Sequence, residues 1–122
     1  MANILIVDDE EQLLYLLKAV LDRRSARNDI ILAPSAEDAL ETFEAGKYDL
    51  MLVDLRLGGM NGLEFCLQVR EFDKEVIILA VTAFYDPIFT NYDGKMAGFD
   101  GVFAKPYDFS KLLDYLEEKG FL

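Results

Sequence analysis

Three aspartates, a threonine and a lysine are the side chains whose types and positions could carry chemistry in this sequence. Each follows a short apolar run: Asp8-Asp9, Asp54, Thr82 and Lys105. A set of oxygen ligands that includes no histidine favours a hard cation. Mg²⁺ is the expected ion, and Mn²⁺ is the alternative. A carboxylate beside such an ion is a competent nucleophile toward phosphorus and would form an acyl phosphate. The lysine would then neutralise charge on the phosphoryl oxygens, and the threonine hydroxyl would donate a hydrogen bond to them.

The composition removes several other chemistries. Histidine is absent, which excludes Ser-His-Asp and Cys-His nucleophiles and histidine-rich zinc sites. Cys66 is the only cysteine, so an internal disulfide cannot form. It lies in an apolar helical stripe with Leu63 and Leu67, a position typical of a buried core thiol rather than a reactive one.

The charge and hydropathy limit the partners. The chain has 12 basic and 23 acidic residues and a net charge of −11, so it lacks the basic footprint that direct nucleic-acid binding needs. No apolar run approaches the roughly 20 residues that span a bilayer, and no N-terminal stretch resembles a signal peptide. We therefore expect a cytoplasmic protein with neither a nucleic acid nor a membrane as its direct partner.

Short apolar runs alternate with amphipathic segments along the chain. Strands are expected at residues 4–7, 30–33, 50–53, 76–81 and 102–104. Helices are expected at 11–24, from the N-cap Ser35 to Gly46, at 63–72, at 110–119, and from Asp86-Pro87 onward, where Gly94 would shorten or bend the helix. This alternation predicts a parallel sheet covered on both faces. Residues 1–122 would then form one α/β domain, a flavodoxin-like (βα)5 fold with strand order 2-1-3-4-5.

That strand order would gather the polar side chains at one edge. In open α/β sheets, ligands bind beyond the carboxyl ends of the strands. Asp8, Asp54 and Thr82 would follow three adjacent strands, with Lys105 after a fourth. Polar residues also follow strands simply because the chain leaves the core there. Three carboxylates, a hydroxyl and a lysine on four adjacent strands favour a functional site over that explanation.

In these residues the chain resembles, over its whole length, the receiver domain of bacterial two-component response regulators. The order and spacing that carry the resemblance are those of Asp8-Asp9, Asp54, Met60-Asn61-Gly62, Thr82-Ala83 and Lys105-Pro106. The resemblance implies that Asp54 accepts a phosphoryl group from a sensor histidine kinase or a phosphotransfer protein. Such a domain is not a classical enzyme, although it promotes its own phosphorylation and dephosphorylation.

The resemblance also implies roles for the neighbouring residues. Asp9, Asp54 and the backbone carbonyl of Arg56 would hold Mg²⁺, with Asp8 acting through water. The residues that bind the phosphoryl group and undergo the conformational switch would be Thr82, Ala83 and Lys105. The peptide bond between Lys105 and Pro106 is expected to be cis.

The sequence departs from the usual receiver pattern in three features. Val102 stands three residues before the lysine, where receivers commonly place an aromatic residue, and Phe103 lies next to it. The stretch from Thr82 to Lys105 is about one residue longer than usual. The positions that influence hydrolysis of the acyl phosphate hold the bulky residues Arg56 and Phe84, from which we expect slow self-hydrolysis.

Aromatic residues are concentrated in the last third of the chain. Ten of the 15 Phe and Tyr residues lie from Phe84 onward. One interpretation is that most of them pack in the core. The other is that the helix after Asp86, the strand 102–104 and the last helix form a face that binds a downstream protein, as the resemblance implies, or a second copy of the chain.

Two further functions compete with the phosphorylated switch. A Mg²⁺-dependent phosphohydrolase with an aspartyl nucleophile generally needs a second acid two residues later, where this chain has Arg56. A receiver-like protein-binding module that is never phosphorylated is the other alternative. The sequence fits both a free-standing regulator and the first domain of a longer protein.

Overall fold

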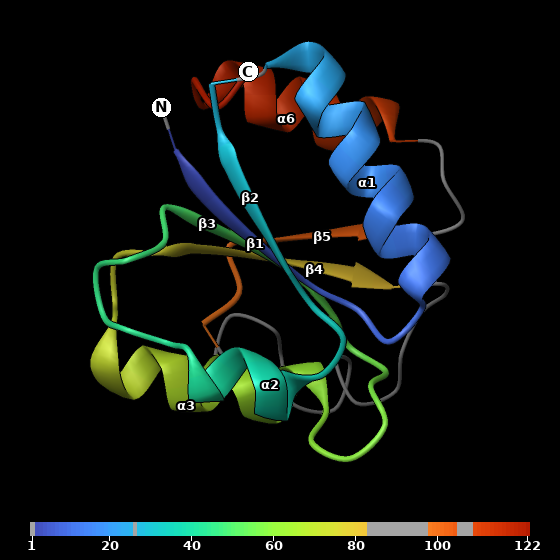
Figure 1. The fold of residues 1–122 in the computed structure, drawn as a ribbon. Coiled ribbons are helices and arrows are strands. Elements are labelled where there is room, and N and C mark those ends of the chain that lie inside the picture. The colour runs from blue at the N-terminus through green and yellow to red at the C-terminus, as the bar shows by residue number, and fades with distance from the viewer. Residues whose placement is uncertain (1, 26, 83–97, 105–108) are drawn as a thin grey trace.

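The computed structural model describes residues 2–25, 27–82, 98–104 and 109–122 (Figure 1). Its strands form one parallel sheet in the order β2-β1-β3-β4-β5, which confirms the predicted fold class. The strands are β1 (Asn3–Val7), β2 (Asp29–Ala33), β3 (Leu50–Asp54), β4 (Ile77–Thr82) and β5 (Gly101–Ala104). The helices are α1 (Glu11–Arg24), α2 (Ala36–Glu41), α3 (Gly62–Phe72) and α6 (Ser110–Glu118).

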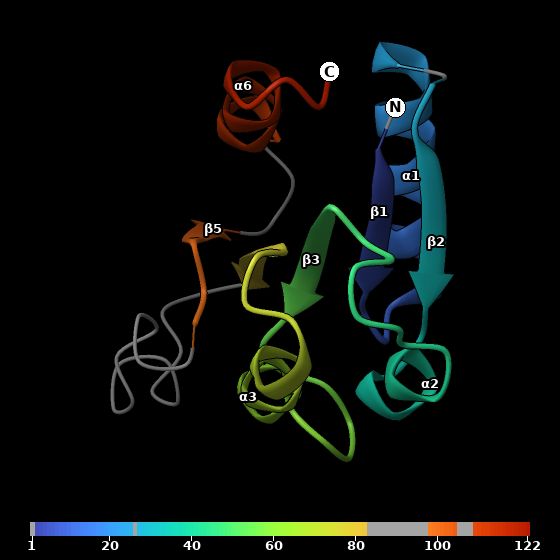
Figure 2. The same cartoon turned by 90° about the vertical axis from the view of Figure 1, so that its left-hand side faces the viewer.

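The helices cover the two faces of the sheet in pairs. Figures 1 and 2 show α1 and α6 on one face and α2 and α3 on the other. Successive side chains of β3 alternate between these faces, because side chains in a strand have a period of two. Leu50 and Leu52 belong to the core under α1 and α6, whereas Met51 and Val53 belong to the core under α2 and α3. The continuous apolar run is thus explained by burial on both sides.

Helix α2 is shorter than predicted. The Ser35 hydroxyl caps it as expected, accepting the Asp38 N–H at 3.0 Å, but the helix ends at Glu41 rather than near Gly46. Thr42 leaves the helix with φ −106° and ψ 4°. Gly46, at φ 80°, lies in a later turn and donates its N–H to Asp73. The glycine therefore serves that turn and does not cap the helix.

The stripe predicted around Cys66 is buried only in part. Cys66 and Leu63 are buried, which confirms the core thiol, whereas Leu67 is 44 % exposed and lies outside the buried part of the stripe. A residue that directly follows a buried helical residue is rotated by about 100° around the helix axis, here far enough to face solvent.

The start of α3 lies directly against the end of β3. The Asn61 side chain caps the helix by accepting the Glu64 N–H at 2.9 Å. A Cβ atom at Gly62 would collide with the backbone carbonyl of Asp54, so only glycine permits this approach. None of the helices in the described part of the chain combines the length and apolar character needed to cross a membrane.

The helix expected after Asp86, with Pro87 and Gly94, lies outside the described residues.

Candidate metal and phosphoacceptor site

The sheet brings three predicted site residues to one edge. The structure pairs Val7 with Val53 in adjacent strands, so Asp8 and Asp54 follow neighbouring positions. Among the aspartates and threonines that the structure describes, only Asp8, Asp54 and Thr82 are buried, at 2 %, 5 % and 7 % exposure. Burial of two carboxylates in one place is costly unless a cation or hydrogen bonds offset their charge. Their shared location therefore indicates a functional site.

A third acidic residue joins the two buried aspartates. Carboxylate oxygens of Asp8, Glu10 and Asp54 lie within 4.8 Å of one another. Mg²⁺ binds oxygen at about 2.1 Å, which places ligands on opposite sides of the ion about 4.2 Å apart. The three residues therefore fit one divalent cation with little movement. The sequence interpretation missed Glu10, although an acid directly after an aspartate pair was the signal that could have identified it.

Backbone amides orient both buried aspartates. The Glu10 N–H donates to Asp8 Oδ1 at 2.9 Å, and the Arg56 N–H donates to Asp54 Oδ1 at 3.0 Å. Each bond joins an aspartate to the amide two residues further on, the pattern of an Asx turn. The orientation of each carboxylate is therefore set by the main chain that leaves its strand.

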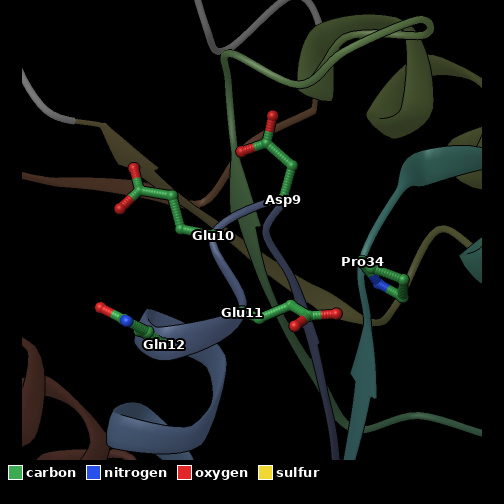
Figure 3. Close-up of a pocket in the computed structure, with 5 residues that line it drawn as sticks. All are labelled: Asp9, Glu10, Glu11, Gln12 and Pro34. Atoms are coloured by element: carbon green, nitrogen blue, oxygen red, sulfur yellow. The ribbon is translucent and has the colours of Figure 1, made fainter.

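Asp9 has a different environment from Asp8. It is exposed, and its Oδ2 accepts the Gly58 N–H from the loop after β3 at 3.4 Å. Figure 3 shows Glu11 directed toward Pro34, whereas Asp9 and Glu10 point away from it. These residues line an open groove of about 530 Å³. Asp9 is not among the three residues whose oxygens cluster, and its role as a cation ligand stays a prediction.

The remaining predicted residues are described only in part. Thr82 is the last residue of β4 and pairs with Ala104, the residue before Lys105. The Arg56 side chain is exposed. The other predicted site residues lie outside the described residues: Ala83, Phe84, Lys105 and Pro106.

Val102 and Phe103, three and two residues before Lys105, lie on opposite faces of β5. Val102 pairs with Ala80 and is 42 % exposed. Phe103 packs into the core under α1 and α6, where its ring meets Tyr115 edge-on at a centroid distance of 5.6 Å. An aromatic side chain is thus present next to position 102, but it is turned toward the other face of the sheet.

Comparison with known proteins supports the same interpretation. The family model for the response regulator receiver domain matches residues 4–117. The transcriptional regulatory protein YvrH of Bacillus subtilis is 36 % identical over 107 residues, which cover 88 % of this chain and 44 % of that protein. The alkaline phosphatase synthesis transcriptional regulatory protein PhoP of the same species is 38 % identical over 105 residues, covering 86 % of this chain and 42 % of PhoP. The chain therefore spans less than half the length of these two relatives.

Solved structures extend the similarity to three dimensions. The response regulator TrrA of Thermotoga maritima, in complex with Mg²⁺-BeF, has a TM-score of 0.81 and 30 % identity, with 97 % of this chain and 98 % of TrrA covered. The chemotaxis protein CheY4 of Vibrio cholerae has a TM-score of 0.82 and 28 % identity over the same shares of the two chains. On the family match, the strand order and the acidic edge of the sheet, the chain belongs to the receiver domain family of two-component response regulators.

Proposed function

We propose that Asp54 is the phosphoacceptor of this receiver domain. The observation that carries the proposal is the position of its carboxylate, which is buried at the carboxyl edge of the sheet and clustered with Asp8 and Glu10. An Asp54 oxygen would form a bond to phosphorus while the bond from phosphorus to the donor's imidazole nitrogen breaks. The electron pair of that broken bond would remain on the nitrogen.

The ligand set follows from the same edge. Receiver domains bind Mg²⁺ through acidic residues. Here Asp9, Asp54 and the backbone carbonyl of Arg56 would hold it, with Asp8 acting through water, and Mn²⁺ would fit the same oxygen ligands. Once bound, the cation would offset negative charge on the carboxylates and on the phosphoryl oxygens. Glu10, exposed beside the two buried aspartates, would add a further carboxylate at this site.

The phosphoryl-binding residues come from the ends of the next two strands. The buried Thr82 hydroxyl would donate a hydrogen bond to a phosphoryl oxygen, while Lys105 would neutralise its charge. Ala83 would take part in the switch with Thr82, and the bond between Lys105 and Pro106 would be cis. The domain would promote its own phosphorylation and dephosphorylation, at a rate set partly by Arg56 and Phe84.

The partners follow from the phosphoryl chemistry. Response regulators receive phosphoryl groups from histidine kinases and act on output domains. For this chain, residues 1–122 would act as one domain that takes the group from a histidine kinase or a phosphotransfer protein. Phosphorylation would shift a two-state equilibrium that a downstream protein reads. The face made by the segment after Asp86, by β5 and by α6 would bind that protein or a second copy of the chain.

One comparison tests the assignment of Asp54. The wild-type protein is incubated with Mg²⁺ and a small phosphodonor, in parallel with the Asp54→Asn and Asp114→Asn variants, and intact masses are recorded. Asp114 is an exposed carboxylate on α6 and serves as the matched control. We expect one phosphoryl group on the wild type and on Asp114→Asn, and none on Asp54→Asn.

The same proteins, incubated also with phosphoesters and assayed for released phosphate, separate the alternatives. If no donor modifies the wild type, the domain acts as a binding module that is not phosphorylated. If phosphate is released over many turnovers from phosphoesters, the protein is a hydrolase. Either outcome would contradict the proposal, as would full modification of Asp54→Asn.

A further inference from the structure

The loop between β3 and α3 is held by hydrogen bonds from two directions. On the side of β1, the Gly58 N–H donates to Asp9 Oδ2 at 3.4 Å. On the side of α2, the Met60 N–H donates to Glu37 Oε2 at 3.0 Å. The two amides are separated by Gly59 alone. The loop that directly follows the proposed phosphoacceptor is therefore hydrogen-bonded to a candidate cation ligand on one side and to the first turn of α2 on the other.

Glu37 lies close to two consecutive residues of the loop, Gly59 and Met60. A Cβ atom at Gly59 would collide with Glu37 Oε2, and Gly59 has φ +76°, a conformation that side chains rarely adopt. The backbone hydrogen bond from Met60 lowers the pKa of Glu37 below its ordinary value of 4.5. At neutral pH the side chain is therefore a carboxylate, which can only accept hydrogen bonds, and here it accepts one from the loop.

The position of Glu37 in α2 suits this role. It lies in the first turn, next to the N-cap Ser35, where a negative charge interacts favourably with the helix dipole. Asp38 occupies the same turn and is also acidic and exposed, but its N–H is the one that Ser35 caps. The two neighbours thus share charge and helix position, and the structure joins the Glu37 carboxylate to the loop.

The same loop carries groups that belong to the phosphoacceptor site. The Arg56 N–H donates to Asp54 Oδ1, and the Arg56 carbonyl is a proposed cation ligand. The Gly62 N–H donates to the Leu55 carbonyl at 3.1 Å and closes the base of the loop. Because the base is fixed in this way, the anchor at Met60 determines where the intervening residues lie. A change at Glu37 would thus reach the site through Gly58 and Arg56.

We propose that Glu37 is a positioning residue of the cation and phosphoryl site, which holds the loop 56–60 so that its carbonyl and amide groups meet the acidic cluster. This inference rests on the proposed function, because it assumes that a divalent cation binds beside Asp54. The Glu37 carboxylate is not part of the cluster of Asp8, Glu10 and Asp54, and it would act on the site only through the loop. Its contribution is to order the loop before the cation binds. Without this contact, cation binding would have to order the loop backbone, and the loss of conformational entropy would weaken the affinity.

The test measures cation affinity directly. Mn²⁺ binding is followed by the loss of the electron paramagnetic resonance signal of free Mn²⁺, for the wild type and for Glu37→Ala, Glu37→Gln and Asp38→Ala. We expect Glu37→Ala to bind Mn²⁺ about 3- to 10-fold more weakly, which corresponds to roughly 0.7–1.4 kcal/mol. Asp38→Ala removes the same charge from the same turn and should stay within about twofold of the wild type.

The Glu37→Gln variant distinguishes the effect of the lost hydrogen bond from the effect of the lost negative charge. In Glu37→Gln the amide oxygen still accepts the Met60 N–H, so the affinity should return to within about twofold of the wild type. Equal losses in Glu37→Ala and Asp38→Ala would overturn the proposal in favour of a general electrostatic effect. Unchanged affinity in Glu37→Ala, with a shifted Met60 amide resonance proving that the bond was lost, would also overturn it.

The outcome is separable from a failure of the proposed function. The Asp54→Asn variant is included in the same titration. If the proposed cation site is wrong, the wild type binds no Mn²⁺, and if phosphorylation alone fails, the wild type still binds Mn²⁺ but gains no mass from the phosphodonor. If only the role of Glu37 is wrong, the wild type binds Mn²⁺ and Asp54→Asn binds it weakly, while Glu37→Ala matches the wild type.

Discussion

Gly62 packs against the backbone carbonyl of Asp54 so closely that no side chain fits between α3 and the end of β3. The helix therefore begins directly on the residue proposed to accept the phosphoryl group. The Gly62 N–H also donates to the Leu55 carbonyl, which ties the first residue of α3 to the residue after Asp54. Correct placement of Asp54 thus depends on the absence of a Cβ atom eight positions later in the chain.

The first prediction concerns this contact. Gly62→Ala should lower the free energy of unfolding by about 1–3 kcal/mol, because the added methyl group must displace backbone atoms. Gly58→Ala is the matched control, since a Cβ atom there meets nothing within 4 Å. Its effect should stay within about 0.5 kcal/mol. Urea unfolding measures both values, and equal stabilities for the two variants would contradict the packing argument.

The second prediction concerns Arg70, which joins α3 to the segments on either side of the 83–97 stretch. Its guanidinium donates to the Gly98 carbonyl at 2.7 and 3.0 Å and to the Val76 carbonyl at 2.6 Å, and it pairs with Asp100 at 3.0 Å. The Arg70 side chain is 17 % exposed. Arg70→Met should therefore destabilise the fold by about 2–3 kcal/mol, because several partly buried acceptors lose a charged donor.

A surface arginine provides the comparison for Arg70. Arg24 pairs with Glu117 at 3.1 Å, but the two side chains are 43 % and 61 % exposed. Arg24→Met should cost less than about 1 kcal/mol, as is usual for exposed ion pairs. Thermal and urea unfolding of the two variants should rank Arg70→Met clearly below Arg24→Met, and the reverse order would show that the Arg70 bonds contribute little.

The third prediction concerns the buried thiol. Burial raises the pKa of Cys66 from 9.0 to about 12. Between these values the folded state keeps a proton that the unfolded state has lost, so the free energy of unfolding should fall as the pH rises above about 9. Removing the thiol in Cys66→Ala removes this contribution. The free energy of unfolding of the variant should therefore fall less steeply between pH 9 and pH 11. Urea unfolding at several pH values measures this dependence. Identical pH dependences for the variant and the wild type would refute the raised pKa of Cys66.

The fourth prediction concerns Asp73 at the end of α3. Burial raises its pKa, but backbone hydrogen bonds from Gly46, Val76 and Glu75 outweigh burial and hold the pKa below 3.8. The carboxylate therefore stabilises the fold above the unfolded pKa, and this contribution is lost as the pH falls through the folded pKa. Asp73→Ala should be less stable than the wild type at pH 7, and the difference should shrink below about pH 4. Asp114→Ala, on an exposed helix surface, is the control and should stay within about 0.5 kcal/mol of the wild type at pH 7.

The fifth prediction concerns the lifetime of the acyl phosphate. Phe84 follows Thr82 by two residues, at a position that the resemblance to receivers predicts to influence access of water to the phosphoryl group. Replacing this bulky side chain in Phe84→Ala should shorten the phosphoryl half-life. Phe72→Ala is the control, because Phe72 is 69 % exposed at the far end of α3. Release of radiolabelled phosphate measures both half-lives, and an unchanged value for Phe84→Ala would refute the prediction.

Much of the fold could be predicted because local signals were strong and mutually consistent. The apolar run of β3 and the helical spacing of α1 are each readable from neighbouring residues, and the bounds predicted for α1 agree with the structure. The Ser35 cap was predictable for the same reason, since a cap involves residues three positions apart. The error at the end of α2 arose where Gly46 pairs with Asp73, a partner 27 residues away.

The sequence by itself determined which reactive groups are present and that they follow four of the five predicted strands. Only the tertiary structure decided which of these side chains lie close to one another. In the folded chain, Glu10 lies close to Asp54, Asp9 accepts a hydrogen bond from Gly58, and Glu37 accepts one from Met60. The last two contacts join residues that are 49 and 23 positions apart in the sequence. A carboxylate's partner depends on side-chain direction and loop packing, and residue type and strand order leave both of these open.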